Sequence, residues 1–428
     1  MSKPSAEIWP FEPRPGPQSA SALAAPKVDG RSLDELASGE VKLPLASLVL
    51  INFNYAQFVG AAIDSIRAQD YPRLEVAVID NASTDNSREV IAKHVGGDAR
   101  FKIIHADRNE FVMGAALRGL AATSGEFVGF IDADDCLFSN FVSTHVQVHL
   151  ALPRSVAFTS SNVVEIAVDG AMLAGGRKQV AYKVDPAKRG LRAEDTVPRL
   201  ATIPDDAYER LGSSVVSLSH TKKGWLWSTG SANFYRRSLL EFARPRCGVD
   251  ALNILSADGY FARFCHWLAG SAMIERPLSA YRIHGANLFG QTPSMTGFLG
   301  GTGRAENWLP RRRRELLRAV LERADEISKR TEPGRFWGIL DQAIDALRGP
   351  RRDEFRGEQV LAAFAENLSL LVKTFGLRPT LAELRHRLPF GAVRSIMRRA
   401  NQGQIPAAVR SALRAAEARH VLRTILLR

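Results

Sequence analysis

Acidic residues that follow two apolar runs are the side chains in this chain best suited to chemistry. Asp132 and Asp134 come directly after the run Phe130-Ile131, and Asp80 ends a second run. Clustered carboxylates repel one another unless a cation lies between them, and Mg²⁺ and Mn²⁺ prefer oxygen ligands of this kind. We therefore expect Asp132 and Asp134 to hold a divalent cation, which would neutralise the charge of a diphosphate leaving group.

An Asp-rich turn whose side chains cap a helix is the alternative for such a cluster. That alternative is the better one for an isolated Asp-x-Asp sequence. Here, however, Asp80 takes the matching place after another run. Ligands of open α/β sheets bind beyond the carboxyl ends of the strands, so the repeated placement favours a ligand site.

The elements that would position these residues are strands and helices in alternation. Short apolar runs predict strands at 48–51, 74–79, 101–104 and 127–131, with helices between them. This alternation predicts an α/β sheet with right-handed crossovers. Farther along, the pattern is less regular and predicts two short strands and one helix, at 156–159, 163–166 and 252–268.

Three regions are expected along the 428 residues. Residues 1–45 are rich in Pro and Ala and predict a leader or linker. Residues 46–300 form the expected α/β domain, divided into a first half at 46–150 and a second half at 151–300. Residues 301–428 show apolar stripes at helical spacing and predict an additional all-helical C-terminal region.

Composition places the chain among ordinary globular proteins and excludes a disulfide scaffold. Apolar residues make up 45% and charged residues 24% of the chain, and three cysteines leave one unpaired. No apolar run reaches the length of about 18 residues that a membrane-spanning helix needs. The expected location is therefore the cytoplasm.

The net charge of +12 lies entirely in the C-terminal region, where residues 301–428 hold 26 Lys and Arg against 14 Asp and Glu. Residues 405–428 interleave apolar and arginine side chains, a pattern typical of a basic amphipathic helix on an anionic membrane surface. We expect peripheral docking on the inner face of the cell membrane. A helical homodimer interface is the alternative. Nucleic acid is disfavoured because Phe390 is the sole Phe, Trp or Tyr after Gly376.

Three segments together resemble the nucleotide-binding half of the family 2 glycosyltransferases. They are Ser47–Asn54, Val78–Asp85 and Gly125–Asp135, in family order and at family-like separations. The resemblance is strongest over residues 46–150 and looser to about 290. It implies a GT-A fold, in which a mixed sheet flanked by helices binds a nucleotide-diphosphate sugar.

The family resemblance also implies roles for individual residues. Asp80 would contact the nucleotide base, and Asp132 and Asp134 would hold the ribose and a metal–diphosphate, with Mn²⁺ or Mg²⁺ as the ion. Asp258 lies in a segment similar to the family's second acidic motif and is the expected general base, with Asp250 as the competitor. Residues 281–287 are similar to a late family segment, and we assign His284 there to the metal.

The positions expected to contact the nucleotide sugar lie in these segments and in the loop and helix before the fourth strand. They are Asn54, Asp80, Asp85, Asn109, Arg118, Asp132 and Arg282. The chain departs from the family at two places: Ala116 and Leu117 stand where an Arg-Asn pair is common, and Ala257 stands where a Glu often precedes the base.

The expected function is that of an inverting, metal-dependent glycosyltransferase that moves a sugar from a nucleotide-diphosphate donor to a hydroxyl of a glycan or lipid-linked acceptor, in the synthesis of surface glycans. A catalytically weak or inactive scaffold protein that binds sugar nucleotides is the alternative, favoured by the two departures.

Overall fold

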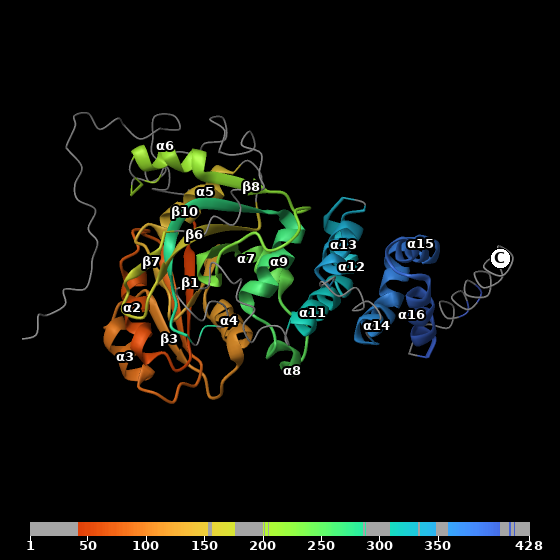
Figure 1. The fold of residues 1–428 in the computed structure, drawn as a ribbon, viewed down its shortest axis with the longest axis horizontal. Helices are drawn as coiled ribbons and strands as arrows, with labels where there is room; N and C mark the ends of the chain where they lie inside the picture. The colour runs from red at the N-terminus through yellow and green to blue at the C-terminus, as the bar shows by residue number, and fades with distance from the viewer. Residues whose placement is uncertain are drawn as a thin grey trace, which may run out of the picture.

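A computed structural model describes residues 42–152, 156–175, 200, 202–203, 205–285, 287, 309–332, 334–347, 358–402, 411 and 415. Figure 1 shows a mixed sheet flanked by helices and a row of helices that leads away from one side of it. The expected leader at 1–45 lies almost wholly outside the described residues, and so does the expected amphipathic helix at 405–428.

The sheet has ten strands among the described residues, with the order β3-β2-β1-β4-β9-β6-β10-β5, while β7 pairs with β6 and β8 pairs with β10. The strands are β1 (Ala46–Asn52), β2 (Leu74–Asp80), β3 (Phe101–His105), β4 (Phe127–Asp132), β5 (Cys136–Leu137), β6 (Phe158–Ile166), β7 (Met172–Ala174), β8 (Val215–Leu218), β9 (Asn233–Arg236) and β10 (Ser271–Arg282).

The expected α/β sheet is confirmed, with the first four predicted strands as parallel neighbours. β9 then runs antiparallel to β4 and β6, and β6 pairs in parallel with β10, so the complete sheet is mixed. The two short strands expected within 156–166 form one continuous strand, β6, because all nine of its residues are buried and paired with neighbours.

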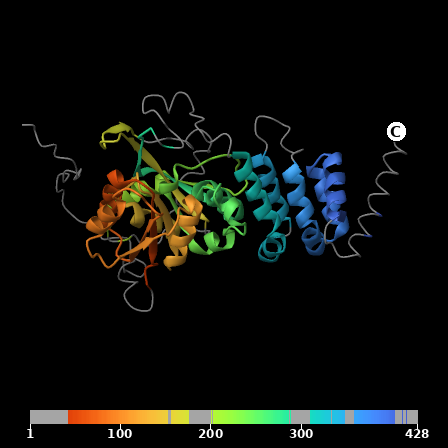
Figure 2. The ribbon, with the colours of Figure 1, turned by 90° about the horizontal axis from the view of Figure 1, so that it is seen from below.

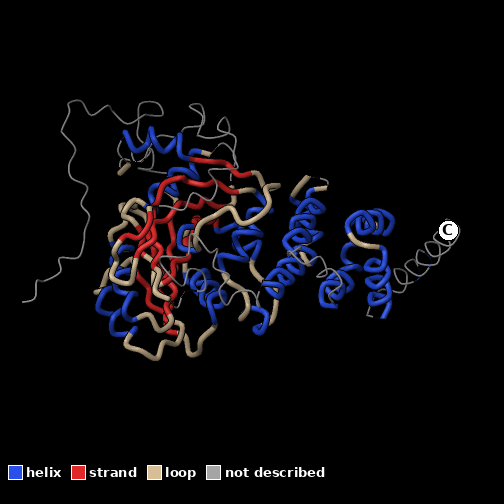
Figure 3. The backbone as a smooth tube through the Cα atoms, viewed as in Figure 1, coloured by secondary structure: helices blue, strands red, loops and turns tan. Residues whose placement is uncertain are grey.

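Helices cover both faces of the sheet, as the colours of Figure 3 make clear. They are α2 (Ala56–Arg67), α3 (Ser87–Val95), α4 (Phe111–Ala122), α5 (Phe141–Ala151), α6 (Asp205–Ser214), η3 (Gly230–Ala232), α7 (Arg237–Ala243), α8 (Val249–Leu252) and α9 (Ala257–Ala269). The expected helix at 252–268 begins five residues later than predicted, at Ala257, because α8 ends at Leu252 and an irregular stretch separates the two helices.

Side chains of β1 alternate between two hydrophobic cores. Leu48 and Leu50 pack with α2 and α3, whereas Val49 and Ile51 belong to the core that contains α4 and α9. This second core continues without a break into the C-terminal helices, so the helical region is packed against the sheet domain. Figure 2 shows the same row of helices from below.

The C-terminal region is helical, as expected. Its elements are α11 (Leu309–Leu321), α12 (Ala324–Arg330), α13 (Arg335–Leu347), α14 (Glu358–Phe375), α15 (Leu377–Arg387) and α16 (Phe390–Gln402). Arg323 joins it to the domain: this buried guanidinium donates to the carbonyls of Phe242 and Arg244. Arg335 donates in the same way to Leu268 at 2.7 Å. In the described part of the chain, no helix is both long and apolar enough to cross a membrane.

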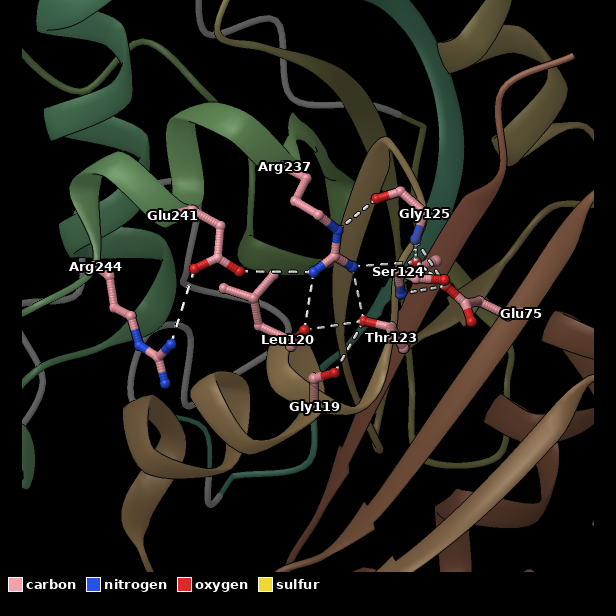
Figure 4. Close-up of polar contacts among 10 residues, drawn as sticks. Glu75, Gly119, Leu120, Thr123, Ser124, Gly125, Arg237, Glu241 and Arg244 are labelled. Atoms are coloured by element: carbon pink, nitrogen blue, oxygen red, sulfur yellow. Dashed lines mark hydrogen bonds and ion pairs between the residues drawn. The ribbon is translucent and has the colours of Figure 1, made fainter. Parts of the chain in front are cut away.

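Arg237 locks the helix α7 against the sheet, as Figure 4 shows. Its guanidinium donates to the carbonyl oxygens of Gly125 at 2.5 Å and Leu120 at 2.8 Å, and to the Thr123 hydroxyl at 2.8 Å. Burial lowers the pKa of Arg237, and Glu241 at 3.7 Å acts in the opposite direction. The residue thereby fixes the turn from which β4 starts, and β4 carries Asp132 at its other end.

Candidate functional site

The carboxyl ends of β1, β2 and β4 bring the predicted acidic residues to one edge of the sheet. Asn52 is level with Asp80 in the β1–β2 pair, and Ile51 is level with Asp132 in the β1–β4 pair. This placement follows from the parallel pairing, since the strands end together and their loops emerge on the same side.

Three carboxylates lie together just beyond β4. Oxygen atoms of Asp132, Asp134 and Asp135 all fall within 4.8 Å of one another, with Asp134 and Asp135 buried and Asp132 at the open side. The surrounding protein desolvates Asp132, and Asp134 and Asp258 repel its charge, so its pKa rises to about 8. Desolvation and the same crowding raise the pKa of Asp135 well above its usual value.

This donor set fits a divalent cation. Hard oxygen ligands in close array gain the most when a positive charge enters, because desolvation and repulsion between neighbouring carboxylates already raise the pKa values of Asp132 and Asp135. His284 adds a nitrogen ligand candidate, because its Nε2 lies 2.9 Å from Asp134 Oδ2. The imidazole packs against the rings of both Tyr55 and Phe58, with centroid separations of 5.3 and 5.1 Å.

Tyr55 was not selected from the sequence and belongs to this cluster. Burial raises its pKa to about 12, and the negative charges of Asp134, Asp132 and Asp135 add to the effect. Ser231 was also missed: its hydroxyl accepts the Asp132 backbone N–H at 3.1 Å. Its place in the polar run 228–233, which leads into β9, was the signal that could have identified it.

Asp258, the expected base, lies near Asp132 although the two residues are far apart in sequence. A Cβ added at Gly230 would lie 3.3 Å from the Cβ of Asp258 and 3.9 Å from Asp132 Oδ2. Asp258 sits in the first turn of α9 and is half-buried. The competitor Asp250 is an exposed residue of α8.

Arg282 is predicted to contact the nucleotide sugar, but in the structure its guanidinium binds backbone carbonyls of the protein. Its guanidinium donates to the carbonyls of Asp134 at 2.9 Å, Ala167 at 3.1 Å and Val168 at 2.8 Å, and it is buried. The side chain therefore holds the loop that carries Asp134. Its role as a direct ligand of the nucleotide sugar stays a prediction.

Asp80 ends β2, and its carboxylate is contacted by the side chains of Arg88 and His105. Arg88 Nε donates to its Oδ2 at 2.9 Å, and His105 Nδ1 lies 3.2 Å from the same oxygen. Burial raises the pKa of Asp80, but hydrogen bonds from Ser83, Arg88 and His105 outweigh burial and hold it below its usual value. The carboxylate thus stays ionised beside two partly exposed side chains, Arg88 and His105, which sequence reasoning did not select.

Asn54 and Asp85 organise the neighbouring loops. Asn54 has a φ of 57° and accepts the Thr84 backbone N–H at 2.7 Å. Asp85 accepts backbone N–H groups at the starts of two helices, from Ala56 and from Ser87, each at 3.0 Å. The chain therefore uses Asp85 to join α2 and α3. Contact of either side chain with a nucleotide stays a prediction.

Asn109 and Arg118 line a cavity of about 510 Å³ between α4 and α8. Asn109 accepts from the Asn81 side chain at 3.0 Å and from the Phe111 backbone at 2.7 Å. Arg118 makes a two-point ion pair with Glu110, at 2.6 and 2.9 Å. No interaction in the described part of the chain joins Arg118 to the carboxylates beyond β4, so the structure places it outside that cluster.

The aromatic run before Asn233 is mainly core. Trp227 is fully buried and donates through Nε1 to Ser271 Oγ at 2.9 Å. Trp225 is half-buried, stands edge-on to Trp227 and carries the Arg263 guanidinium 4.9 Å above its ring. Packing in the hydrophobic core therefore accounts for Trp227.

Comparisons with known proteins find glycosyltransferases among the relatives of this chain. An uncharacterized glycosyltransferase from Nostoc sp. is 30% identical over 244 residues, which cover 56% of this chain and 65% of that protein. A GalNAc(5)-diNAcBac-PP-undecaprenol beta-1,3-glucosyltransferase from Campylobacter jejuni is 35% identical over 106 residues, or 24% of this chain and 34% of that protein. The chain thus spans less than two thirds of either relative.

Among solved structures, S. aureus TarS superposes with a TM-score of 0.47 at 13% identity, over 83% of this chain and 54% of that one. Residues 47–211 match the family model described as glycosyl transferase family 2. This range contains the three recognised segments and all three clustered carboxylates. Over residues 47–211, the chain is therefore similar to glycosyl transferase family 2.

Proposed function

We propose that this chain is an inverting, metal-dependent glycosyltransferase that uses a nucleotide-diphosphate sugar. The observation that carries the proposal is the carboxylate cluster, with oxygen atoms within 4.8 Å of one another and Asp258 across Gly230 from Asp132. A cluster with raised pKa values suits a cation, and a separate carboxylate beside it suits a base.

Asp134 and Asp132, with His284, are the residues that would hold Mn²⁺ or Mg²⁺. The ion would supply positive charge for the diphosphate of the donor. Arg282 and Ser231 keep the ligands in place through the backbone of Asp134 and Asp132. Tyr55 and Phe58 enclose His284 and limit its rotation.

Asp258 acts as the general base in this mechanism. It takes the proton of the acceptor hydroxyl while the oxygen forms a bond to the anomeric carbon, and the bond from that carbon to the diphosphate breaks. Because the attack and the departure occur on opposite faces of the sugar in a single displacement, the anomeric configuration inverts.

The acceptor is proposed from relatives and is placed in surface glycan synthesis. The name of the Campylobacter relative states that it acts on an undecaprenol-linked glycan. A glycan carried on a lipid is therefore the proposed acceptor class. We also propose the division into a glycosyltransferase domain at 46–300 and a basic helical region at 301–428.

Peripheral membrane docking through the basic end of the chain is proposed with it. In the described helices α15 and α16, six arginines accompany one acidic residue, Glu383. Replacing Arg410, Arg414, Arg419 and Arg423 with Gln should reduce binding to phosphatidylglycerol vesicles and leave binding to phosphatidylcholine vesicles at its low level. Equal binding of the variant and the wild type to the anionic vesicles would contradict this proposal.

Calorimetry of UDP, GDP and dTDP, each with and without Mn²⁺, tests the donor site. The wild type should bind one of them in an Mn²⁺-dependent way, and Asp134→Ala should lose that binding. Asp325→Ala is the matched control, because Asp325 is a carboxylate of α12 paired with Lys329. If the wild type binds no nucleotide, the glycosyltransferase proposal fails.

A further inference from the structure

Arg263 brings a guanidinium to the candidate base. Its Nη1 donates to the Gly259 carbonyl at 3.1 Å, and the Gly259 backbone N–H donates to Asp258 Oδ1 at 2.6 Å. The Arg263 guanidinium and the Asp258 carboxylate are therefore linked through the backbone of Gly259 at the start of α9. The ring of Trp225 supports the guanidinium from the other side, 4.9 Å from its central carbon.

The first helix of the C-terminal region adds two more cations. Arg312 of α11 donates through Nε to the Ile254 carbonyl at 2.5 Å, in the stretch just before α9. Arg313 follows it, and its charge acts on Arg263. Burial and, less strongly, the charge of Arg313 lower the pKa of Arg263 to about 10, while Asp258 acts in the opposite direction. Burial also lowers the pKa of Arg312, and Asp258 again opposes the shift.

Positive charge is in excess here. Within the described residues, no carboxylate forms an ion pair with Arg263, Arg312 or Arg313. By contrast, Arg318, on the same helix, pairs with Glu366 at 2.9 Å. The negative charge of Asp258 acts on Arg263 and Arg312, so one carboxylate serves a cluster of three half-buried guanidiniums. An excess of half-buried positive charge is costly, and a bound anion would offset that cost.

We propose that Arg263, Arg312 and Arg313 bind a phosphate or diphosphate group carried by the acceptor, next to the base Asp258. This inference rests on the proposed function and names the acceptor class: a phosphate-linked glycan. The planar guanidinium matches the oxygen geometry of phosphate. The donor diphosphate has its own place, at the carboxylates beyond β4, so the two substrates use separate anion sites.

The C-terminal helical region thereby completes the acceptor site. Two of the three arginines belong to α11, and the apolar face of α11 shares one core with α9. A chain without this region would keep the carboxylates beyond β4 but lose two thirds of the proposed anion site.

Calorimetry without Mn²⁺ or nucleotide tests the proposal, with geranyl diphosphate as the probe and geraniol as its uncharged counterpart. The wild type should bind geranyl diphosphate and not geraniol. Arg312→Gln and Arg313→Gln should each weaken binding by about tenfold or more, as expected when a charged hydrogen-bond donor is lost. Arg311→Gln, on the same helix but exposed, is the matched control and should change binding by less than about twofold.

UDP binding with Mn²⁺, measured on the same proteins, separates the two sites. It should be unchanged in all three variants. The proposal is overturned if a wild type that binds UDP fails to bind geranyl diphosphate. It is also overturned if Arg311→Gln weakens binding of geranyl diphosphate as much as Arg312→Gln and Arg313→Gln do. A third contrary result would be that Arg312→Gln and Arg313→Gln lose as much affinity for UDP as for geranyl diphosphate. If loss of the Ile254 contact unfolds Arg312→Gln, then Arg313→Gln decides the result. A wild type that binds no nucleotide overturns the proposed function instead.

Discussion

Asp258 and Asp132 face each other across Gly230. A side chain at position 230 would have its Cβ 3.3 Å from the Cβ of Asp258 and 3.9 Å from Asp132 Oδ2. An added Cβ would therefore make a tight contact with Asp258, and a larger side chain would press between the two acidic residues, which come from α9 and β4.

Enlarging position 230 should separate these residues. Gly230→Val should lower the rate of sugar transfer by about 10²-fold or more, because small displacements of catalytic groups are costly. The thermal midpoint should change much less. Gly338→Ala is the control, since an added Cβ there meets nothing within 4 Å. A Gly230→Val protein with wild-type turnover would exclude a catalytic role for this junction.

Replacing the candidate base should separate chemistry from binding. Asp258→Asn should lower kcat by about 10²–10⁴-fold, the usual contribution of a positioned base, and leave Mn²⁺-dependent nucleotide binding intact. Asp250→Asn is the matched control, because this carboxylate is exposed on α8. If Asp250→Asn loses kcat and Asp258→Asn does not, the two roles are reversed.

Removal of one cluster charge should stabilise the metal-free protein. Desolvation and the repulsion from Asp134 and Asp258 raise the pKa of Asp132 to about 8. The folded state then binds a proton that the unfolded state releases, so the contribution of Asp132 to stability falls as pH rises from about 4 to 8. Asp134→Asn should flatten this slope and raise the free energy of unfolding at pH 8 by about 1 kcal/mol or more, measured in urea with EDTA. An unchanged slope would show that the carboxylates do not interact.

Arg237 should contribute to the free energy of unfolding and not to ligand binding. Arg237→Met leaves the carbonyls of Gly125 and Leu120 without their donor and should cost about 2–4 kcal/mol, because several buried acceptors lose partners together. Arg67→Met, at a half-exposed arginine of α2, should cost less than about 1 kcal/mol. Equal losses in urea unfolding would contradict the structural role.

The buried His149 should make the protein sensitive to acid. Burial and the charge of Arg236 lower its pKa to about 3, and its Nε2 lies 2.9 Å from the Phe234 carbonyl oxygen. Below about pH 6.5, His149 is protonated in the unfolded state but stays neutral in the folded state. The contribution of His149 to stability therefore falls as pH decreases from about 6.5 to 3. His149→Gln should reduce the slope by up to about 1.4 kcal/mol per pH unit. Urea unfolding at pH 4, 5 and 6 measures it, and parallel curves would refute the assignment.

The strands of the first half and the placement of its carboxylates could be predicted from the sequence. Parallel strands are buried on both faces and so appear as continuous apolar runs, and the polar residues after them mark the carboxyl edge. Asp132, Asp134 and Asp80 were found in this way. The continuous strand β6 was predicted as two strands because its polar centre, Ser160–Asn162, hides its burial.

Only the tertiary structure decided what lies around those carboxylates. The sequence contains His284, Asp258 and Arg312, but chain separations such as 58 residues for Arg312 and Ile254 or 150 for His284 and Asp134 give no local signal that these residues converge on Asp132 or α9. Packing also assigned Arg282 and Asp85 to backbone contacts, because hydrogen-bond partners depend on distance in space and not on residue type. Residue types therefore determined which chemistry is available to this protein, and the close packing of β4, η3, α9 and α11 decided which residues lie close enough to carry it out.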